Sequence, residues 1–180
     1  MGGGARPIIN GTFTKPNVST DGLIRAHNGG GYMHFKNLNI KNSLGAGIGI
    51  KFVSGSSDYN IVENNYVQQT TYQGIVLVRC SYSLVYDNIV EEASYHRYPG
   101  AGIEITRQNS ETESVYNEIY RNKVYWGWEG IGIYQGSRYT EVYNNLVFNN
   151  GSFHIFIANA RGANVYNNLV YEGDESGLYH

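Results

Sequence analysis

Short stretches in which apolar and polar residues alternate recur along the whole chain. Residues 142–147 read Val-Tyr-Asn-Asn-Leu-Val, and the same six residues return unchanged at 165–170, 23 positions later. Alternation with a period of two predicts β-strands that bury one face. An identical hexamer at a fixed interval predicts a structural repeat, and a unit of 23 residues is too short to fold as a separate domain.

Relatives of this hexamer occur at 32–40, 61–67, 84–90 and 119–124, which makes six copies in all. Each copy contains an asparagine that serves as its anchor, and these anchors are Asn37, Asn65, Asn88, Asn122, Asn145 and Asn168. Their spacings are 28, 23, 34, 23 and 23 residues, so the basal period is 23 and two coils carry insertions of about 5 and about 11 residues. We expect each Asn to turn a corner and to hydrogen-bond to the equivalent Asn one coil away.

A second repeated strand, with the pattern Gly-Ile-x-Ile, follows most anchors after about ten residues. Its copies begin at Gly47, Gly74, Gly102, Gly130, His154 and Gly177. Two such strands per repeat, joined by corners too short for a helix, predict an all-β fold: a single-stranded right-handed parallel β-helix solenoid of about six to seven coils. The expected core column is Ile48, Ile75, Ile103, Ile131 and Ile155. A leucine-rich repeat would need a Leu-rich consensus and a helical return, and a β-propeller would need about twice the period.

Composition agrees with an all-β fold in a single domain that spans residues 1–180. The chain has 23 Gly and 17 Tyr but 3 Pro; Gly and Asn suit tight corners, whereas Tyr suits half-buried strands. The formal net charge of −2 and the pI near 6.2 give no cationic field that would attract DNA or RNA, so no nucleic-acid partner is expected. Cys80, the one cysteine, cannot form an internal disulfide, and no apolar stretch of ~20 residues predicts membrane insertion.

The two ends of the chain carry no segment that is patterned to cap a solenoid. The chain starts almost directly in a strand and ends at 177–180, just inside a coil. An open coil exposes strand edges and core. We therefore expect either a fragment of a longer protein or a homo-oligomer that associates through its uncapped coil ends. Residues 1–6 also lack the apolar segment of a signal peptide, although the expected origin is secreted or periplasmic.

The Asn-x-Val/Ile and Gly-Ile-x-Ile coils between Tyr32 and His180 resemble the right-handed parallel β-helix proteins of the pectin-lyase-like superfamily. That superfamily includes lyases, hydrolases, epimerases and non-catalytic surface proteins, so the resemblance implies the fold and leaves the activity open. Two functions are compatible with it. One is a carbohydrate-active polysaccharide lyase that acts by β-elimination on an acidic, uronate-containing polysaccharide. The other is a non-catalytic module for surface binding or assembly.

Polar residues on the outward side of the Gly-Ile-x-Ile strands are the first candidates for a site, because inward residues are occupied with packing. Five such residues fall on adjacent coils: Lys51, Arg79, Glu104, Arg107 and Tyr134. Arg79 and Arg107 would stand about one strand spacing apart and would repel each other unless an anion, such as a uronate carboxylate, lay between them. The alternative is that Glu104 pairs with the two arginines on a solvated face.

Aromatic and charged residues beside this face form a second group of candidates. The insertion at 95–99 and the corresponding place one coil later supply most of them, namely His96, Arg97, Tyr98, Trp126, Trp128 and Glu129, and His154 follows on the next coil. Aromatic rings stack on the C–H faces of sugars, while His, Arg and Glu supply hydrogen bonds and charge. We predict a substrate-binding role for this group, in which His96 is also a catalytic candidate. The alternative is that its aromatic members cover the edge of the core.

β-Elimination suits these residues because the C5 proton of a uronate becomes acidic once a cation neutralises the adjacent carboxylate. Arg79 and Arg107 are the candidates for this neutralisation. The candidates for base or acid are Lys51, His96, Tyr134 and His154. In outline the chain is similar to the polysaccharide lyases that include alginate lyases and chondroitinase B, which use a Lys and an Arg on neighbouring coils and often calcium held by acidic residues.

The chain differs from that lyase pattern at one position, because Gly102 stands where a second carboxylate would precede Glu104. We therefore predict no cofactor and no metal ligands, with calcium as the alternative that the resemblance implies. A polygalacturonase-type hydrolase would need paired aspartates on adjacent coils. The aspartates Asp21, Asp58, Asp87 and Asp174 are scattered instead. The expected partner is thus an acidic polysaccharide.

Overall fold

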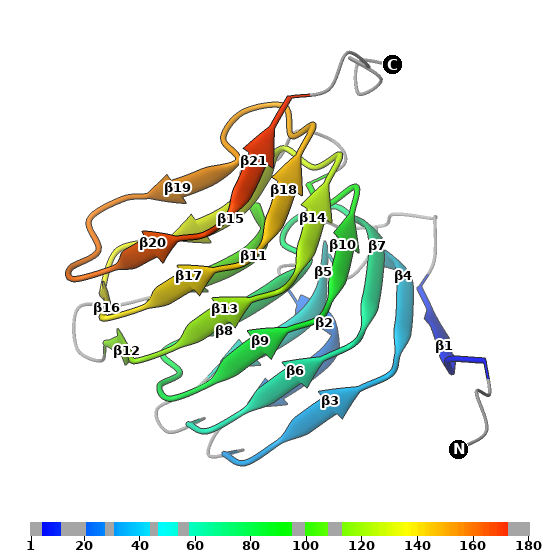
Figure 1. Ribbon diagram of the computed structural model, residues 1–180. Coiled ribbons are helices and arrows are strands. Elements are labelled where there is room, and N and C mark those ends of the chain that lie inside the picture. The colour runs from blue at the N-terminus through cyan, green and yellow to red at the C-terminus, as the bar shows by residue number, and fades with distance from the viewer. Residues whose placement is uncertain are drawn as a thin grey trace.

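The computed structural model describes residues 5–11, 21–27, 31–43, 47–53, 58–94, 100–107 and 113–172. Throughout these residues the chain winds into a parallel β-solenoid (Figure 1). The same residues include no helix that is long and apolar enough to cross a membrane. The predicted all-β parallel solenoid is therefore confirmed.

Within the described residues the successive coils build three long parallel sheets (Figure 1). Sheet A contains β1 (Ile8–Asn10), β4 (Asn39–Ser43), β7 (Tyr66–Thr70), β10 (Ile89–Glu91), β14 (Lys123–Tyr125), β18 (Leu146–Phe148) and β21 (Leu169–Tyr171). Sheet B contains β2 (Asp21–His27), β5 (Gly47–Val53), β8 (Ile75–Val78), β11 (Ala101–Thr106), β15 (Glu129–Ile133) and β19 (Ile155–Ile157). Sheet C contains β3 (His34–Lys36), β6 (Ile61–Glu63), β9 (Leu84–Tyr86), β13 (Glu118–Tyr120), β17 (Glu141–Tyr143) and β20 (Asn164–Tyr166). Between sheets B and C, β12 (Ser114–Val115) pairs with β16 (Ser137–Arg138).

Apolar side chains from all three sheets fill the inside of the solenoid, because alternation along each strand turns every second residue inward. The fully buried residues include Val67 and Val90 of sheet A, Ile103 of sheet B, and Val85 and Ile119 of sheet C. In the last described coil, by contrast, several large hydrophobic residues are well exposed, among them Val165 at 42%, Leu169 at 61% and Val170 at 44%. The predicted copy that begins at Gly177 lies outside the described residues, so the expected lack of caps stays a prediction.

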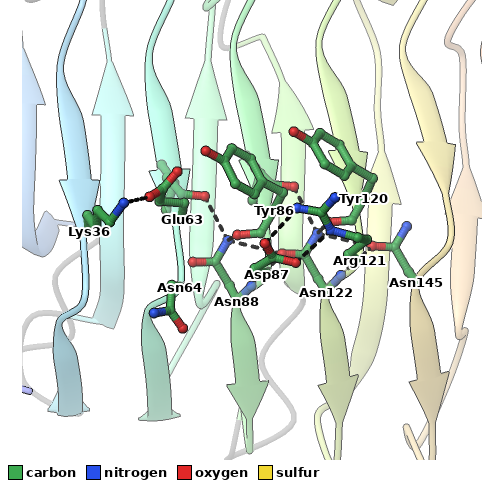
Figure 2. Close-up of polar contacts among 12 residues, drawn as sticks. Lys36, Glu63, Asn64, Tyr86, Asp87, Asn88, Tyr120, Arg121, Asn122 and Asn145 are labelled. Atoms are coloured by element: carbon green, nitrogen blue, oxygen red, sulfur yellow. Dashed lines mark hydrogen bonds and ion pairs between the residues drawn. The ribbon is translucent and has the colours of Figure 1, made fainter. Parts of the chain in front are cut away.

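A ladder of asparagines, buried except at its last member Asn168, runs along the corner between sheets C and A, as the repeat predicts. Its members are Asn65, Asn88, Asn122, Asn145 and Asn168. The side-chain oxygen of Asn122 accepts the backbone N–H and the side-chain N–H of Asn88, both at 3.0 Å (Figure 2). Asn122 in turn donates its amide to Val85 O at 2.9 Å and to the oxygen of Asn145 at 3.0 Å. Because every buried amide has partners, the ladder holds the coils in register without an unsatisfied polar group.

The residue before each ladder asparagine turns the corner in the left-handed region. These residues are Asn64, Asp87, Arg121, Asn144 and Asn167, with φ between 50° and 55°. Asn and Asp adopt this conformation more readily than most residues, which explains the Asn-Asn pairs of the sequence.

The prediction of Asn37 as the first anchor of the ladder is wrong by one residue. Phe35 pairs with Val62, so the position of Asn65 is taken in the preceding coil by Leu38, whose backbone N–H donates to Asn65 Oδ1 at 3.0 Å. Asn37 instead aligns with Asn64, to which it is hydrogen-bonded at 2.7 Å. A leucine breaks the Asn pattern here, and asparagines stand on both sides of it, at 37 and 39.

The predicted core column also has the wrong isoleucine at its start. Ile50, and not Ile48, pairs with Ile75. The sequence at 47–50 contains Gly-Ile twice, so the pattern fits both registers equally well. Packing selects one of them, because a Cβ on Gly49 would lie only 2.6 Å from Gly74 O and from Val67 Cγ1. The glycine is required where the two coils come closest.

Candidate functional site

The outward face of sheet B brings several of the predicted catalytic residues onto neighbouring strands. The pairing places Lys51 opposite Val76, Val76 opposite Glu104, and Glu104 opposite Gly132. Counting from Gly47, the Gly-Ile-x-Ile pattern predicts that Lys51 aligns with Val78 and Tyr134. That prediction is wrong by two residues, because the structure uses the second Gly-Ile of 47–50 and pairs Lys51 with Val76. Lys51 is 5% exposed and Glu104 is 7% exposed, so this face is not a solvated surface at these positions.

Glu104 has a polar but enclosed environment. Its Oε2 accepts a hydrogen bond of 2.8 Å from Gln73 Nε2, and the backbone N–H of Ala101 also contributes. Burial raises the pKa of Glu104 to about 7; the hydrogen bonds oppose this rise, the charge of Glu129 adds to it and the charge of Lys51 reduces it. The partner of Glu104 is thus Gln73, and the carboxyl group can both take up and release a proton near neutral pH.

Tyr134 and Glu129 complete the group around Glu104. The Tyr134 hydroxyl donates to a carboxylate oxygen of Glu129. Burial and this hydrogen bond hold the pKa of Tyr134 above its usual range, and the charge of Glu104 contributes. The Tyr134 ring lies over Gly132, where a Cβ would come within 2.3 Å of a ring carbon. We call Lys51, Gln73, Glu104, Glu129 and Tyr134 the Glu104 cluster.

Two members of the Glu104 cluster differ from the expectation. Glu129 was expected in a loop beside the sheet, but it is the first residue of β15 and is 8% exposed. Gln73 was not a candidate at all. The signal that could have identified it is its place immediately before Gly74, on the coil next to Glu104.

Arg79 and Arg107 lie on adjacent coils, as predicted, each directly after a strand of sheet B. The backbone N–H of Arg79 donates to Thr106 O at 3.0 Å. The side-chain Nε of Arg79 is buried without a hydrogen-bond partner among the described residues. The Arg107 side chain, however, extends toward the following coil. Its Cδ lies 1.9 Å from the position that a Cβ on Gly136 would occupy. Gly136 has φ of 80°, so both its conformation and its neighbour require glycine.

Arg107 lines a cavity of about 280 Å³ at the corner between sheets B and C. The other lining residues are Glu113, Gly136, Ser137, Arg138, Asn159 and Arg161. Arg138 Nη2 lies 2.7 Å from Glu113 Oε1, and Arg138 forms a parallel bridge with Arg161 of the next coil. We call this cavity the arginine pocket. Only Arg107 was predicted from the sequence, although the spacing of 23 between Arg138 and Arg161 matches the basal period and could have revealed the pair.

The predicted sugar-binding residues are only partly described. Trp126 is half-buried and packs edge-on against Tyr125 of sheet A, with ring centroids 5.1 Å apart. Trp128 is half-buried too, and its backbone N–H donates to Ala93 O at 3.0 Å. His154 has a buried Nε2 that has no hydrogen-bond partner among the described residues. His96, Arg97 and Tyr98 lie outside the described residues.

The outward side of sheet C carries tyrosine columns that were not predicted. The first column, which precedes the strands, is Tyr32, Tyr59, Tyr82, Tyr116 and Tyr139, with ring centroids 5.0 to 5.5 Å apart. The second, on the strands, is Tyr86, Tyr120, Tyr143 and Tyr166, with centroids 4.9 to 5.1 Å apart. The first column repeats at intervals of 27, 23, 34 and 23 residues, which are the coil lengths of the structure. This interval was a signal in the sequence that also gives the correct length of the first coil.

A shallow cavity of about 360 Å³ lies beside the first tyrosine column. Its lining residues are Tyr116, Glu118, Tyr139, Glu141 and Asn164. The two carboxylates hold tyrosine hydroxyls of the second column: Tyr143 donates to Glu118 and Tyr166 donates to Glu141, both at 2.8 Å. We call this cavity the tyrosine pocket.

Charged side chains on sheet C pair along the solenoid axis (Figure 2). Lys36 contacts Glu63, and Arg121 makes two hydrogen bonds to Asp87, at 2.8 and 2.7 Å. The hydrogen bond from Arg121 lowers the pKa of Asp87 below its usual value. Among the described residues no group of three or more His, Cys, Asp or Glu side chains is arranged to hold a metal ion.

Comparison with known proteins bears on the fold. Residues 4–170 match the family described as right handed beta helix region. No curated protein and no solved structure matches the chain.

Proposed function

Because the chain belongs to the right-handed beta helix family, we propose that it binds an acidic polysaccharide beside sheet B and cleaves it by β-elimination. The observation that carries this proposal is the Glu104 cluster, in which an enclosed carboxyl group with a pKa raised to about 7 lies among Gln73, Glu129 and Lys51. A general acid or base is most effective when its pKa is close to the working pH. Family membership alone would not indicate an activity.

The chemistry requires one proton to move from carbon to oxygen. Glu104, as a carboxylate, takes the C5 proton of the uronate, and the electron pair of that C–H bond forms the C4–C5 double bond. The bond from C4 to the glycosidic oxygen breaks, and the protonated Glu104 returns its proton to this leaving oxygen. No water is consumed, and the product carries an unsaturated uronate at its new end.

The neighbours of Glu104 support this role. Lys51 favours the carboxylate form of Glu104 through its charge, and the Gln73 amide fixes the orientation of the carboxyl group. Arg79, directly after the adjacent strand β8, is the cation assigned to make the C5 proton of a uronate acidic, whereas Arg107 extends toward the following coil. His96 stays an alternative base.

The direct test is incubation with alginate, pectate and glycosaminoglycans while the ultraviolet absorbance of the unsaturated product is recorded. We expect Glu104→Gln to lower kcat by about 10²- to 10⁴-fold, the usual contribution of a general acid or base. In the wild type, kcat/KM should rise with pH and level off above about 7, because the deprotonated form of Glu104 is the base. Glu172→Gln, at an exposed position after β21, is the matched control and should leave the rate unchanged. Absence of product from every polymer would refute the lyase.

A second candidate function, non-catalytic carbohydrate binding, rests on the tyrosine pocket. The rings of Tyr116 and Tyr139 stack on each other, so they present edges and hydroxyl groups, with 51% and 48% of each residue exposed. Glu118, Glu141 and Asn164 supply acceptors for sugar hydroxyl groups. If this function holds, Tyr116→Ala with Tyr139→Ala abolishes polysaccharide binding, whereas Glu104→Gln leaves it unchanged.

A further inference from the structure

The arginine pocket concentrates positive charge in a chain whose formal net charge is −2. Three guanidinium groups and one carboxylate line it, so its walls carry two net positive charges. A parallel backbone bridge pairs Arg138 with Arg161, so two residues of like charge stand opposite each other on adjacent coils. Like charges opposite each other in a sheet are destabilising unless an anion compensates them.

The backbone around the pocket is shaped to hold these arginines. Gly136 combines φ of 80° with an absent side chain, and the aliphatic part of Arg107 occupies the space that a Cβ would fill. Ser137, 1% exposed, is tied to the preceding coil because its hydroxyl donates to Ile105 O at 3.2 Å. Glu113 Oε1 lies 2.7 Å from Arg138 Nη2, so it compensates part of the positive charge of the pocket.

We propose that the arginine pocket binds the carboxylate or sulfate group of one acidic sugar residue. Guanidinium groups bind such planar or tetrahedral oxyanions through paired hydrogen bonds, more specifically than lysines do. The volume of about 280 Å³ lies at the lower end of ligand pockets, which suits one sugar residue. The choice of a sugar as the carrier of the anion rests on the proposed function, and the pocket would hold the charged repeat of the polymer at the end of sheet B.

The test compares binding of the wild type and of Arg138→Gln with Arg161→Gln by titration calorimetry. The probes are oligogalacturonate, which carries carboxylates, chondroitin sulfate oligosaccharides, which carry both groups, and neutral dextran. We expect the double variant to bind the better acidic probe at least about tenfold more weakly and with a shallower salt dependence, because the contacts that it removes are ionic. Dextran should not bind.

Two further variants separate the pocket from general charge and from misfolding. Arg121→Gln removes an arginine on the outside of sheet C, far along the coil from the pocket, and should bind as the wild type does. Glu113→Gln raises the net charge of the pocket by one, so it should tighten binding and steepen the salt dependence. Thermal unfolding of each variant checks that the solenoid is intact.

The outcomes distinguish this inference from the lyase proposal. Loss of binding in the double variant with no cleavage of any polymer by the wild type would refute the lyase and support the pocket. Cleavage by the wild type, with unchanged binding and cleavage in a folded double variant, would refute the pocket and leave the lyase standing. Binding that Glu113→Gln weakens, or that Arg121→Gln weakens as much as the double variant does, would also overturn the assignment, as would failure of both acidic probes to bind the wild type.

Discussion

The outer faces of sheets B and C are built from the same coils but differ in the residues that they carry and in how far those residues are enclosed. On sheet C the outward column from Tyr86 to Tyr166 repeats one residue type, and its rings stack at intervals close to the strand spacing. On sheet B the outward column reads Arg25, Lys51, Val76, Glu104, Gly132 and Phe156. No residue type repeats, and Lys51 and Glu104 are enclosed.

This difference distinguishes residues whose identity is explained by stacking between coils from residues that stacking does not explain. Where neighbouring coils carry the same residue, the contact between equivalent positions explains the choice, because identical rings or amides stack favourably along a solenoid. Where an enclosed charged residue occurs on one coil alone, no stacking gain offsets the cost of its burial. The catalytic role that we propose would account for the enclosed position of Glu104.

The largest effect that we expect is on sheet B, where Glu104→Gln should increase the free energy of unfolding at neutral and alkaline pH. The opposite result would contradict the contrast between the two sheets. The folded-state pKa of Glu104 is about 7, above the value near 4.5 of a free carboxyl group, so the folded protein binds more protons than the unfolded one between these values. The contribution of Glu104 to stability is therefore most favourable below about pH 4.5 and falls as pH rises through about 7, by up to about 3 kcal/mol. Glu104→Gln should remove this loss.

The measurement is the free energy of unfolding by denaturant for wild type and Glu104→Gln at pH 4.5 and pH 8. We expect the variant to be the more stable of the two at pH 8, with the difference much reduced at pH 4.5. A variant that is less stable at both pH values would mean that Glu104 is a structural residue, like the tyrosines of sheet C.

On sheet C we expect a smaller change in the free energy of unfolding, and here the substitution should lower stability. Tyr120 stacks between Tyr86 and Tyr143, with centroids 4.9 and 5.0 Å away, and the Arg121 guanidinium lies 5.0 Å from its ring. Tyr120→Ala should cost about 1–3 kcal/mol of unfolding free energy, since each aromatic pair contributes about 0.5–1.5 kcal/mol beyond burial. Polysaccharide cleavage should be unaffected. Tyr166→Ala, with one stacked neighbour on this column, is the control and should cost less.

The smallest effect concerns the exposed ion pair of sheet C. Asp87→Asn removes the two hydrogen bonds from Arg121, but both side chains are about half exposed, at 41% and 54%. Exposed pairs contribute little, so the unfolding midpoint at pH 7 should fall by less than about 2 °C. The pKa of Asp87 is lowered, so this contribution is present above the unfolded-state value near 3.9 and is lost as pH falls below it. A large change at neutral pH would show that an ion pair on this face is structurally important after all.

The repeat in the sequence predicted the parallel solenoid, the asparagine ladder and the neighbouring coils of Arg79 and Arg107, because each of these follows from the coil period. It also predicted Glu104 and Tyr134 as neighbours. The prediction for Lys51 failed at the doubled Gly-Ile of 47–50, where two registers match the pattern and only the close approach of Gly49 to Gly74 selects one.

The sequence by itself determined the period of the solenoid. When regular repeats stack, equivalent residues of successive coils become neighbours, whatever the conformation of the corners. Only the tertiary structure decided in which direction the long side chains extend and which charged side chains are buried. Arg107 leans over Gly136 toward Arg138 and Arg161, and Gln73 reaches Glu104 across 31 residues of chain. These contacts depend on how long side chains pass over glycines and corners, which a pattern of residue types along the chain does not specify.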